Sequence, residues 1–457
     1  MKKSYTDSFF DVGSKFGFLP NNHPLTSLPN RYNSLQRLLD NMPVKLSDGS
    51  NGYLAIPNKI ENEVERLPNY IDLVKKESEI LIIQALYRAY CFLTSAYTLE
   101  LSYQEFVKTK KYGKARQILP KQVAQPFVCV AEKLDVYPWL DYHYAYSLGN
   151  YRFLDKSKGF HWSNLDQCVK FSGTSDESGF IMNHVDINQH SPKLVESVLE
   201  SLKAIKDNDQ EKLNENLKQN FHSMVFVNDR RKDMWVASRW KHYNDFRIFI
   251  MGIKGNNEIF DDGLVYQGVW DEPKQYRGQT GAQDNIIPME DIFSGVINFY
   301  PDNQLTKYLL DLRKYRPKCI QNFFVDLKQD IDSIHGGSIF NFLKSSQNSV
   351  GMCYLLAIVE EIYKFRNGHW QFVQKYIMSN TKYAKATGGT PIISWIPNQI
   401  KSVLNFIEVI LHELQSMDKD FDNKQNEIFI NSLNTYKSKR KLLYKQLIVV
   451  SDANYNP

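Results

Sequence analysis

The segment Leu355-LAIVEEIYKFRNGHWQFVQK-Tyr376 decides the fold of this chain. Steps of three and four residues separate the members of one stripe within it, and this spacing places them on a single face of an α-helix. The members of the stripe are Leu355, Ile358, Ile362, Phe365, His369, Phe372 and Tyr376. The segment therefore predicts a helix that carries one imidazole on an otherwise aliphatic and aromatic face.

His369 has two interpretations. A histidine on an apolar face is most often a core residue with a hydrogen-bond partner. Such an imidazole can instead be the single axial ligand of a haem iron. A closed zinc site is not expected, because no second His, Cys or carboxylate stands beside it at the spacing of metal ligands. The stripe alone leaves the first two interpretations open.

Length and composition bound the class of protein. With 457 residues, the chain is long enough for a large core and for more than one domain. Aromatic residues make up 13% of it, which suits a pocket for a flat ligand. The 56 basic and 51 acidic residues leave a net charge of +5 without a long basic tract, so no nucleic-acid partner is expected. The short run Arg230-Arg231-Lys232 is interpreted as a solvated group of charges.

Two further features concern the compartment. Asp7 and Asp11 interrupt any apolar signal segment, and no stretch of about 18 apolar residues is present, so no membrane partner is expected. The five cysteines are isolated and odd in number, which indicates reduced thiols and not a disulfide framework. We therefore expect a cytoplasmic protein, and a monomer.

The order of the periodic segments predicts a mainly α protein with two domains. A small N-terminal mixed domain is expected over residues 1–170, with helices from Ile60 to Leu101 and short strands near Phe127–Val130 and Tyr151–Phe160. A large helical domain is expected over residues 171–457. Its strongest periodic segments cover residues 192–227, 241–253, 290–297, 306–312, 349–379, 398–414 and 427–449.

Two arginines are candidates for binding carboxylates. Arg366 lies one turn before His369 and could pair a haem propionate, although an ordinary surface salt bridge is the simpler interpretation. Arg247 stands inside Phe246-Arg247-Ile248-Phe249, where an unpaired guanidinium would be costly to bury. Its partner is either a substrate carboxylate or a structural Asp or Glu.

Two loop or helix-start motifs are candidates for contacting a ligand. The paired glycines of Thr387-Gly388-Gly389-Thr390 allow close backbone approach to a polar group, as in a lid, but they also mark plain turns. Phe180 and His184 are four residues apart and share one helical face, which provides a ring for stacking beside an imidazole. The simpler interpretation of that pair is a helix start with one satisfied histidine.

Taken together, these blocks resemble the indoleamine 2,3-dioxygenase family, which consists of haem enzymes of tryptophan catabolism. The resemblance extends from Phe16-Gly17-Phe18-Leu19-Pro20 to the loop at Thr387. Its most specific blocks are GLVYQGVWDEPK (263–274), RKYRP (313–317), NFF (322–324) and HWQFVQKYI (369–377). The resemblance implies a small N-terminal domain and a large all-helical domain that holds haem b between its helices.

The resemblance also implies roles for the candidate residues. His369 matches the proximal ligand of the haem iron, and Arg366 the arginine near a propionate. Arg247 matches the arginine that binds the substrate carboxylate, and Phe180 the aromatic residue that packs on the indole. Thr387, Gly388 and Gly389 match the mobile loop that closes over the substrate.

The sequence departs from the family pattern at the distal side. His184 stands where these enzymes carry a small serine, whereas the related tryptophan 2,3-dioxygenases place a histidine there to meet the indole N–H. His242 and Tyr243 stand where the family tends to have two phenylalanines, which predicts a more polar wall. We expect a narrower and more directional pocket than in typical members.

The function that the resemblance implies is cleavage of the indole C2–C3 bond of L-tryptophan, or a related indoleamine, with O2 as co-substrate and N-formylkynurenine as product. His184 would accept a hydrogen bond from the indole nitrogen or steer a proton. The alternative is a different oxidation or rearrangement of an indole at the same haem site. A haem-binding sensor and a cofactor-free helical interaction protein are the non-enzymatic alternatives.

Overall fold

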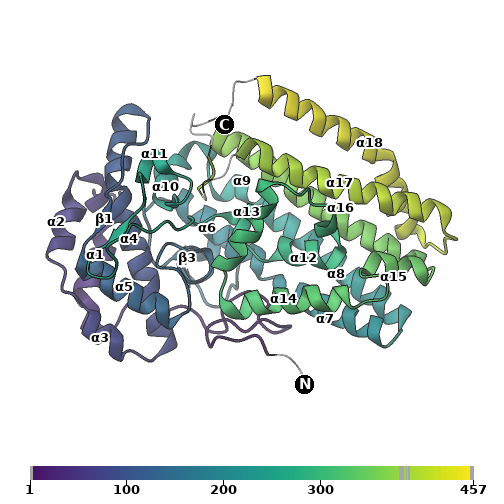
Figure 1. The fold of residues 1–457 in the computed structure, drawn as a ribbon, viewed down its shortest axis with the longest axis horizontal. Coiled ribbons are helices and arrows are strands. Elements are labelled where there is room, and N and C mark those ends of the chain that lie inside the picture. The colour runs from purple at the N-terminus through teal and green to yellow at the C-terminus, as the bar shows by residue number, and fades with distance from the viewer. Residues whose placement is uncertain (1–3, 380–384, 388, 390–391, 453–457) are drawn as a thin grey trace.

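The structure of the protein is a computed structural model that describes residues 4–379, 385–387, 389 and 392–452. Within these residues helices dominate, and the strands form two sheets of two strands each, β1 with β4 (parallel) and β2 with β3 (antiparallel). The prediction of a mainly α, family-like fold is therefore confirmed. The molecule is elongated, with the first part of the chain at one end and a helical bundle at the other (Figure 1).

The first part of the described chain contains five α-helices and three short strands. Their bounds are α1 (Asn33–Asn41), α2 (Lys59–Glu65), α3 (Ile71–Lys76), α4 (Ile80–Thr109), β1 (Ile118–Leu119), α5 (Lys121–Lys133), β2 (Tyr151–Phe153) and β3 (Leu165–Gln167).

The second part contains the remaining α-helices and strand β4. Their bounds are α6 (Ser175–Asn188), α7 (Ser191–Lys206), α8 (Gln210–Lys232), α9 (Met234–Ala237), α10 (Asn244–Arg247), α11 (Asn257–Phe260), β4 (Val265–Tyr266), α12 (Ile286–Ser294), α13 (Gln304–Leu312), α14 (Lys318–Asp332), α15 (Ile339–Ser345), α16 (Ser349–Phe372), α17 (Ile392–Ser416) and α18 (Asn423–Asp452).

Short helical turns join these elements. The 3-10 turns are η1 (Asn30–Tyr32), η2 (Tyr53–Ala55), η4 (Trp162–Asn164), η5 (Trp240–His242), η6 (Ile248–Ile250), η7 (Gly281–Gln283), η8 (Val296–Phe299) and η9 (Arg313–Tyr315), and the π turns are η3 (Tyr142–Tyr146) and η10 (Val373–Met378). A π turn inside a helix often marks a functional site, and η10 directly follows α16.

Helix α4 is the core helix of the first part. By length and composition it could cross a membrane, yet 89% of its most apolar window is buried inside the protein. Two of its buried polar residues, Gln84 and Arg88, donate to the Gly149 carbonyl, at 2.9 and 2.7 Å. These bonds satisfy groups that would be costly to bury unpaired, so α4 serves as a buried scaffold helix.

Helix α16 is the central helix of the bundle. The Asn348 side chain caps its start by accepting a hydrogen bond from the Gly351 N–H at 2.8 Å. It packs against α8 on one side and α17 on the other, and α18 lies outside α17 (Figure 1). The aliphatic stripe residues Leu355, Ile358 and Ile362 are fully buried. The helix predicted from the stripe is therefore present, and it holds His369 in its last turn.

Several local predictions were wrong. Residues Phe127–Val130 belong to helix α5 and not to a strand, because Val123, Phe127 and Val130 form a buried helical face. Tyr151–Phe153 does form strand β2. The single segment predicted over 192–227 is broken between α7 and α8, where Asn208 takes a left-handed φ of 53° and Asp209 caps α8.

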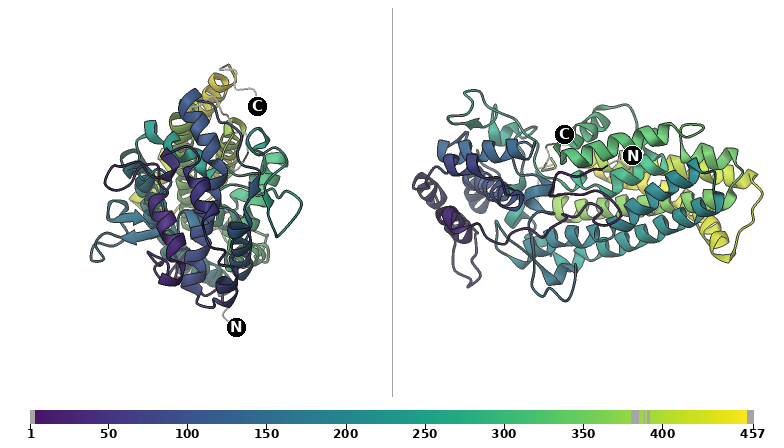
Figure 2. Two further views of the ribbon diagram at one scale, coloured as in Figure 1. Left: turned by 90° about the vertical axis from the view of Figure 1, so that its left-hand side faces the viewer. Right: turned by 90° about the horizontal axis from the view of Figure 1, so that it is seen from below.

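The two parts of the chain share one hydrophobic core, which extends from Phe9 to Leu443. The N-terminal segment contributes directly to it, because Phe18 packs on the rings of Phe323 and Phe324 in α14. Seen from below, the parts follow one another along the long axis (Figure 2). The boundary near residue 170 stays a prediction. All five cysteines are free thiols.

Candidate active site

A cavity of ≈ 250 Å³ lies within the second part of the chain. A second cavity, beside Tyr87 and Trp139, measures only ≈ 10 Å³. Of these two cavities, the larger one can hold an organic ligand. Its walls are formed by α6, α8, α12, α16 with η10, and the segments around residues 280 and 387.

His369 projects into this cavity from α16. Its side chain has accessible surface, yet burial lowers its pKa to about 4, with further lowering by His184, Arg231 and Arg366. The side chain can be accessible and still have a lowered pKa because its accessible edge faces the cavity interior and not bulk solvent. The imidazole is therefore neutral at pH 7. Within the described residues neither of its ring nitrogens makes a hydrogen bond, so it is not a satisfied core histidine.

His184 faces the same cavity from α6. Its Nδ1 lies 2.9 Å from the Phe180 carbonyl oxygen, and because a carbonyl only accepts, Nδ1 carries the proton. The neutral ring therefore presents the lone pair of Nε2, which lies near Gly281 at the cavity wall. Burial lowers the pKa of His184, which favours this neutral form. The predicted acceptor role is chemically available.

An aromatic group surrounds His184. Phe180 lies 5.3 Å from the His184 ring, 5.1 Å from Tyr243 and 5.6 Å from Phe246, measured between ring centroids. Phe180 and Tyr243 both line the cavity. They offer ring faces of the kind that pack against a flat aromatic ligand.

Two local features fix the position of helix α6, which carries Phe180 and His184. The Thr174 side chain caps its first turn by accepting from the Glu177 N–H at 3.3 Å. Gly179 brings α6 close to α9, since a Cβ at this position would lie 1.8 Å from the Ala237 carbonyl oxygen. Position 179 therefore requires glycine.

Arg366 lines the cavity one turn before His369. Its Nη2 donates to Asp291 Oδ2 at 2.6 Å and to the Tyr300 hydroxyl at 2.7 Å. This ion pair is buried and is not the surface salt bridge of the simpler interpretation. Arg366 Nη1 and Asp291 Oδ1 are both buried without a partner among the described residues. An orphaned guanidinium nitrogen at the cavity can receive a ligand carboxylate.

Arg231 also lines the cavity, and its interpretation as part of a solvated charge run was wrong. Its Nε donates to Asn228 Oδ1 at 3.2 Å, and its guanidinium lies 5.7 Å from the Phe372 ring centroid. Gly368 leaves the room for it, because a Cβ there would approach Arg231 Nη1 to 2.0 Å. Burial lowers the pKa of Arg231 to about 10, so it stays cationic.

Sequence reasoning also missed the polar side of the cavity formed by Asp284, Arg313 and Arg316. Asp284 Oδ2 accepts from the Tyr142 hydroxyl at 2.8 Å, and Arg316 Nη2 donates to the Asp284 carbonyl at 3.0 Å. Burial lowers the pKa of Arg316 to about 9. Arg313 and Arg316 both belong to the block RKYRP, which the resemblance had already indicated as specific for the family.

Arg247 is fully buried but does not line the cavity. Its Nη1 donates to the Tyr112 hydroxyl at 3.0 Å and its Nη2 to the Lys385 carbonyl at 2.6 Å. It also hydrogen-bonds Tyr243, whose side chain lines the cavity. Arg247 therefore lies behind Tyr243, and a ligand carboxylate would reach it only after a rearrangement.

The predicted loop lies at the cavity in part. Thr387 is a buried lining residue, and its hydroxyl donates to the Gln279 carbonyl at 2.7 Å. Gly389 has a φ of +87°, with the Lys254 carbonyl where a Cβ would be. Gly388 lies outside the described residues. The segment is thus tied to the chain around residues 254 and 279.

The two predicted polar replacements have different outcomes. Tyr243 lines the cavity, whereas His242 does not. Instead, the side chain of His242 is partly exposed, and its Nδ1 lies 3.0 Å from Asp245 Oδ2. The expectation that His242 makes the wall more polar was therefore wrong.

Comparison with known proteins gives a consistent picture. The family model described as Indoleamine 2,3-dioxygenase matches residues 6–429. Indoleamine 2,3-dioxygenase 1 of Rattus norvegicus is 24% identical over 407 residues, which cover 85% of this chain and 92% of that protein. Indoleamine 2,3-dioxygenase 2 of Homo sapiens is 24% identical, with 88% and 95% covered. A 6-hydroxytryptophan 2,3-dioxygenase of Fusarium equiseti is 22% identical, with 81% and 84% covered.

Proposed function

The chain belongs to the indoleamine 2,3-dioxygenase family, and on this premise we propose that it is a haem-dependent enzyme that cleaves the indole C2–C3 bond of L-tryptophan or a related indoleamine with O2, giving N-formylkynurenine. The observation that carries the proposal is the neutral imidazole of His369, which presents an unbonded ring edge to the large cavity. A small indole is the proposed partner; the monomeric state and the cytoplasmic location stay predictions from the sequence.

The residues at the cavity fit a haem. His369 would hold the haem iron, because an iron ligand must be a neutral imidazole and this ring has no competing hydrogen bond among the described residues. Arg366, through its orphaned Nη1, and Arg231 would pair with the propionates. When bound, the haem supplies the iron chemistry that makes O2 reactive toward an indole.

The protein groups opposite His369 position the substrate. His184 Nε2 accepts a hydrogen bond from the indole N–H, because Nδ1 is already committed to the Phe180 carbonyl. The rings of Phe180 and Tyr243 pack against the indole and exclude water from it. Orientation of this kind can contribute several kcal/mol to lowering the barrier.

Arg247 is the proposed site for the substrate carboxylate, but it must first be released. The Lys385 carbonyl and the Tyr112 hydroxyl hold its guanidinium behind Tyr243. A carboxylate can replace the Lys385 carbonyl as the stronger acceptor for a guanidinium. Substrate binding would therefore shift the backbone at residue 385 and move Tyr243 aside.

A different oxidation or rearrangement of an indole at the same site is the second candidate, and His184 favours it. An imidazole acceptor in place of a hydroxyl could hold a substrate in another orientation or move its indole proton. One relative carries the name 6-hydroxytryptophan 2,3-dioxygenase, which concerns that protein alone.

An ascorbate-driven turnover assay on the haem-loaded protein separates these candidates. L-Tryptophan and O2 should give N-formylkynurenine, identified by mass and by its near-ultraviolet absorbance. Consumption of tryptophan with a product of another mass would replace the first candidate by the second. Haem uptake without consumption of any indole tested would favour a sensor, and absence of a Soret band after haem addition would contradict both enzymatic candidates.

A further inference from the structure

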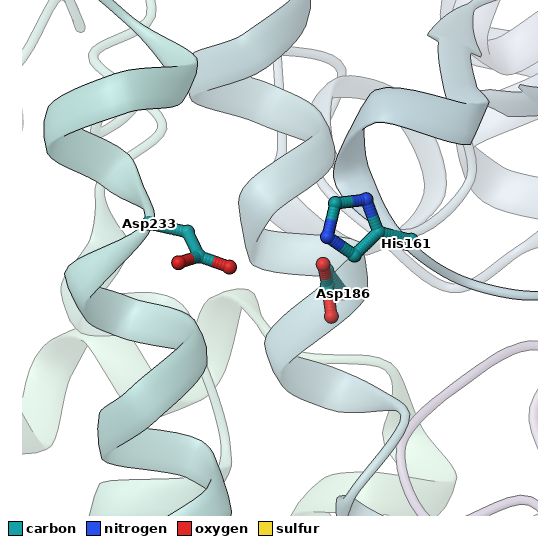
Figure 3. A group of neighbouring side chains, drawn as sticks. All are labelled: His161, Asp186 and Asp233. Atoms are coloured by element: carbon teal, nitrogen blue, oxygen red, sulfur yellow. The ribbon is translucent and has the colours of Figure 1, made fainter.

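A second group of potential ligands lies outside the cavity. His161 precedes η4, Asp186 lies on α6, and Asp233 lies between α8 and α9. One ligand atom from each residue lies within 4.8 Å of the other two. Figure 3 shows the Nε2 edge of the His161 ring facing the two carboxylates. Three segments that are distant in sequence thus place one imidazole and two carboxylates around a common point.

The two carboxylates are incompletely neutralised. Asp186 is fully buried; its Oδ2 accepts from the Trp162 N–H at 2.8 Å, its Oδ1 accepts from the Gln189 amide at 2.5 Å, and burial raises its pKa. Arg230 is the cation beside the pair, 3.2 Å from Asp233 Oδ2 but 3.8 Å from Asp186 Oδ1. Its side chain is 38% exposed, so it can turn into solvent. The site favours an additional or replacing positive charge.

The histidine is already oriented as a metal ligand needs. Its Nδ1 lies 2.7 Å from the Ser163 hydroxyl and accepts from the Ser163 backbone N–H at 3.3 Å, whereas Nε2 faces the two carboxylates. Metal-bound histidines usually donate their second N–H to such an outer partner. In the metal-bound form Nδ1 would carry the proton and donate to the Ser163 hydroxyl, which leaves the lone pair of Nε2 for the cation.

We propose that His161, Asp186 and Asp233 bind one divalent transition-metal cation of the zinc type. An imidazole excludes Mg²⁺ and Ca²⁺ as the preferred ions, whereas one nitrogen and two carboxylate oxygens suit Zn²⁺. Tetrahedral bonds of about 2.1 Å separate ligand atoms by roughly 3.4 Å, so small side-chain rotations close the site. The two carboxylates balance the charge of the cation, and water completes the coordination.

The cation would join two walls of the active-site cavity from outside. Asp186 lies two residues after His184 on the same helix, and Asp233 lies two residues after Arg231. The metal therefore fixes α6 relative to the junction of α8 and α9. This role is independent of the reaction in the cavity, so it can be tested without an activity assay.

Equilibrium dialysis tests the site directly. The haem-loaded protein is stripped with EDTA and dialysed against Zn²⁺, and bound zinc is counted by mass spectrometry separately from haem iron. The wild-type protein should bind one equivalent, and Asp233→Asn should weaken the affinity at least about tenfold. Asp229→Asn is the matched control, because Asp229 is an exposed residue of α8 that pairs with Lys232. Equal affinity in the wild type and Asp233→Asn would overturn the proposal.

Arg230→Gln provides a test with the opposite sign. Removing the competing cation should tighten Zn²⁺ binding several-fold and increase the rise in melting temperature that Zn²⁺ causes. A variant that merely damaged the fold would weaken binding instead. Weaker or unchanged binding in Arg230→Gln would contradict a cation held by these two carboxylates.

Discussion

The two helices that face each other across the cavity each present one histidine, but they prepare it differently. On α6, His184 Nδ1 is bonded to the Phe180 carbonyl of its own helix, which fixes the tautomer. On α16, His369 has no hydrogen bond among the described residues, and its pKa is lowered to about 4 by burial. The ring of His184 therefore offers Nε2 as a directed acceptor, whereas the neutral ring of His369 offers a nitrogen that no described residue holds.

The residues around the two histidines also differ, in charge and in aromatic character. Beside His369 lie the guanidiniums of Arg366 and Arg231, which suit the carboxylates of a cofactor. Beside His184 lie the rings of Phe180 and Tyr243, which suit an aromatic substrate. The wall with the arginines thus suits a group that carries carboxylates, and the aromatic wall suits a flat group.

The strongest test of this comparison is His369→Ala. Without the axial imidazole, we expect loss of tight haem binding and of all turnover, measured by the Soret absorbance and the ascorbate-driven assay. His190→Ala is the control, because His190 stacks on Phe226 outside the cavity at 5.6 Å. Normal haem binding and turnover in His369→Ala would remove the distinction between the two walls.

Arg247→Ala extends the comparison to the guanidinium that lies behind Tyr243. Loss of a charge-assisted bond to the substrate carboxylate, worth about 1.5–3 kcal/mol, should lower kcat/KM about 10- to 100-fold, with KM raised. Tryptamine, which lacks a carboxylate, is the control substrate, and the wild type and Arg247→Ala should both turn it over equally poorly. Retained wild-type kinetics toward tryptophan would show that Arg247 stays locked to Tyr112 and Lys385 and is purely structural.

His184→Ser replaces the directed acceptor with a small hydroxyl. We expect turnover of tryptophan to fall about tenfold, as for one lost hydrogen bond of ~1.4 kcal/mol, and the preference over 1-methyltryptophan to shrink. The ratio of the two substrates is the decisive measurement, because 1-methyltryptophan cannot donate from its indole nitrogen. An unchanged ratio would exclude His184 as the acceptor.

The smallest effect is expected from Glu290→Gln on α12, next to the Asp291 that binds Arg366. Burial raises the pKa of Glu290 to about 8 in the folded protein, from an ordinary value of 4.5. The proton is bound more tightly in the folded state, so the stability from this shift is complete below about pH 4.5 and is lost as pH rises through 8.

Glutamine cannot ionise, so only the wild type loses this stability. The melting temperature of Glu290→Gln minus that of the wild type should therefore increase by about 2 °C between pH 7 and pH 9. Glu408→Gln serves as the control, since Glu408 is exposed and pairs with Arg440. A melting-temperature difference that does not change with pH would show that Glu290 is not protonated in the folded protein.

The sequence by itself determined the helix of His369 and the family. The periodic stripe is a local property, and Leu355, Ile358 and Ile362 are buried as that period requires. The spacing of Phe180 and His184 likewise placed both on one face of α6. Helix α14 was missed although Ile320, Phe323 and Leu327 repeat at helical spacing, so the signal was present there too.

Only the tertiary structure decided which charged groups reach the cavity. The run Arg230-Arg231-Lys232 predicted an exposed side chain for Arg231. It is buried instead, because Gly368 of α16 leaves space for its guanidinium. The sequence left either a substrate carboxylate or a structural Asp or Glu as the partner of Arg247, yet the Tyr112 hydroxyl and the Lys385 carbonyl bind it. Helical period follows from neighbours along the chain, whereas the partner of a guanidinium is set by segments that meet only after folding. For that reason the periodic pattern predicted the helix of His369, whereas only packing placed the charged groups.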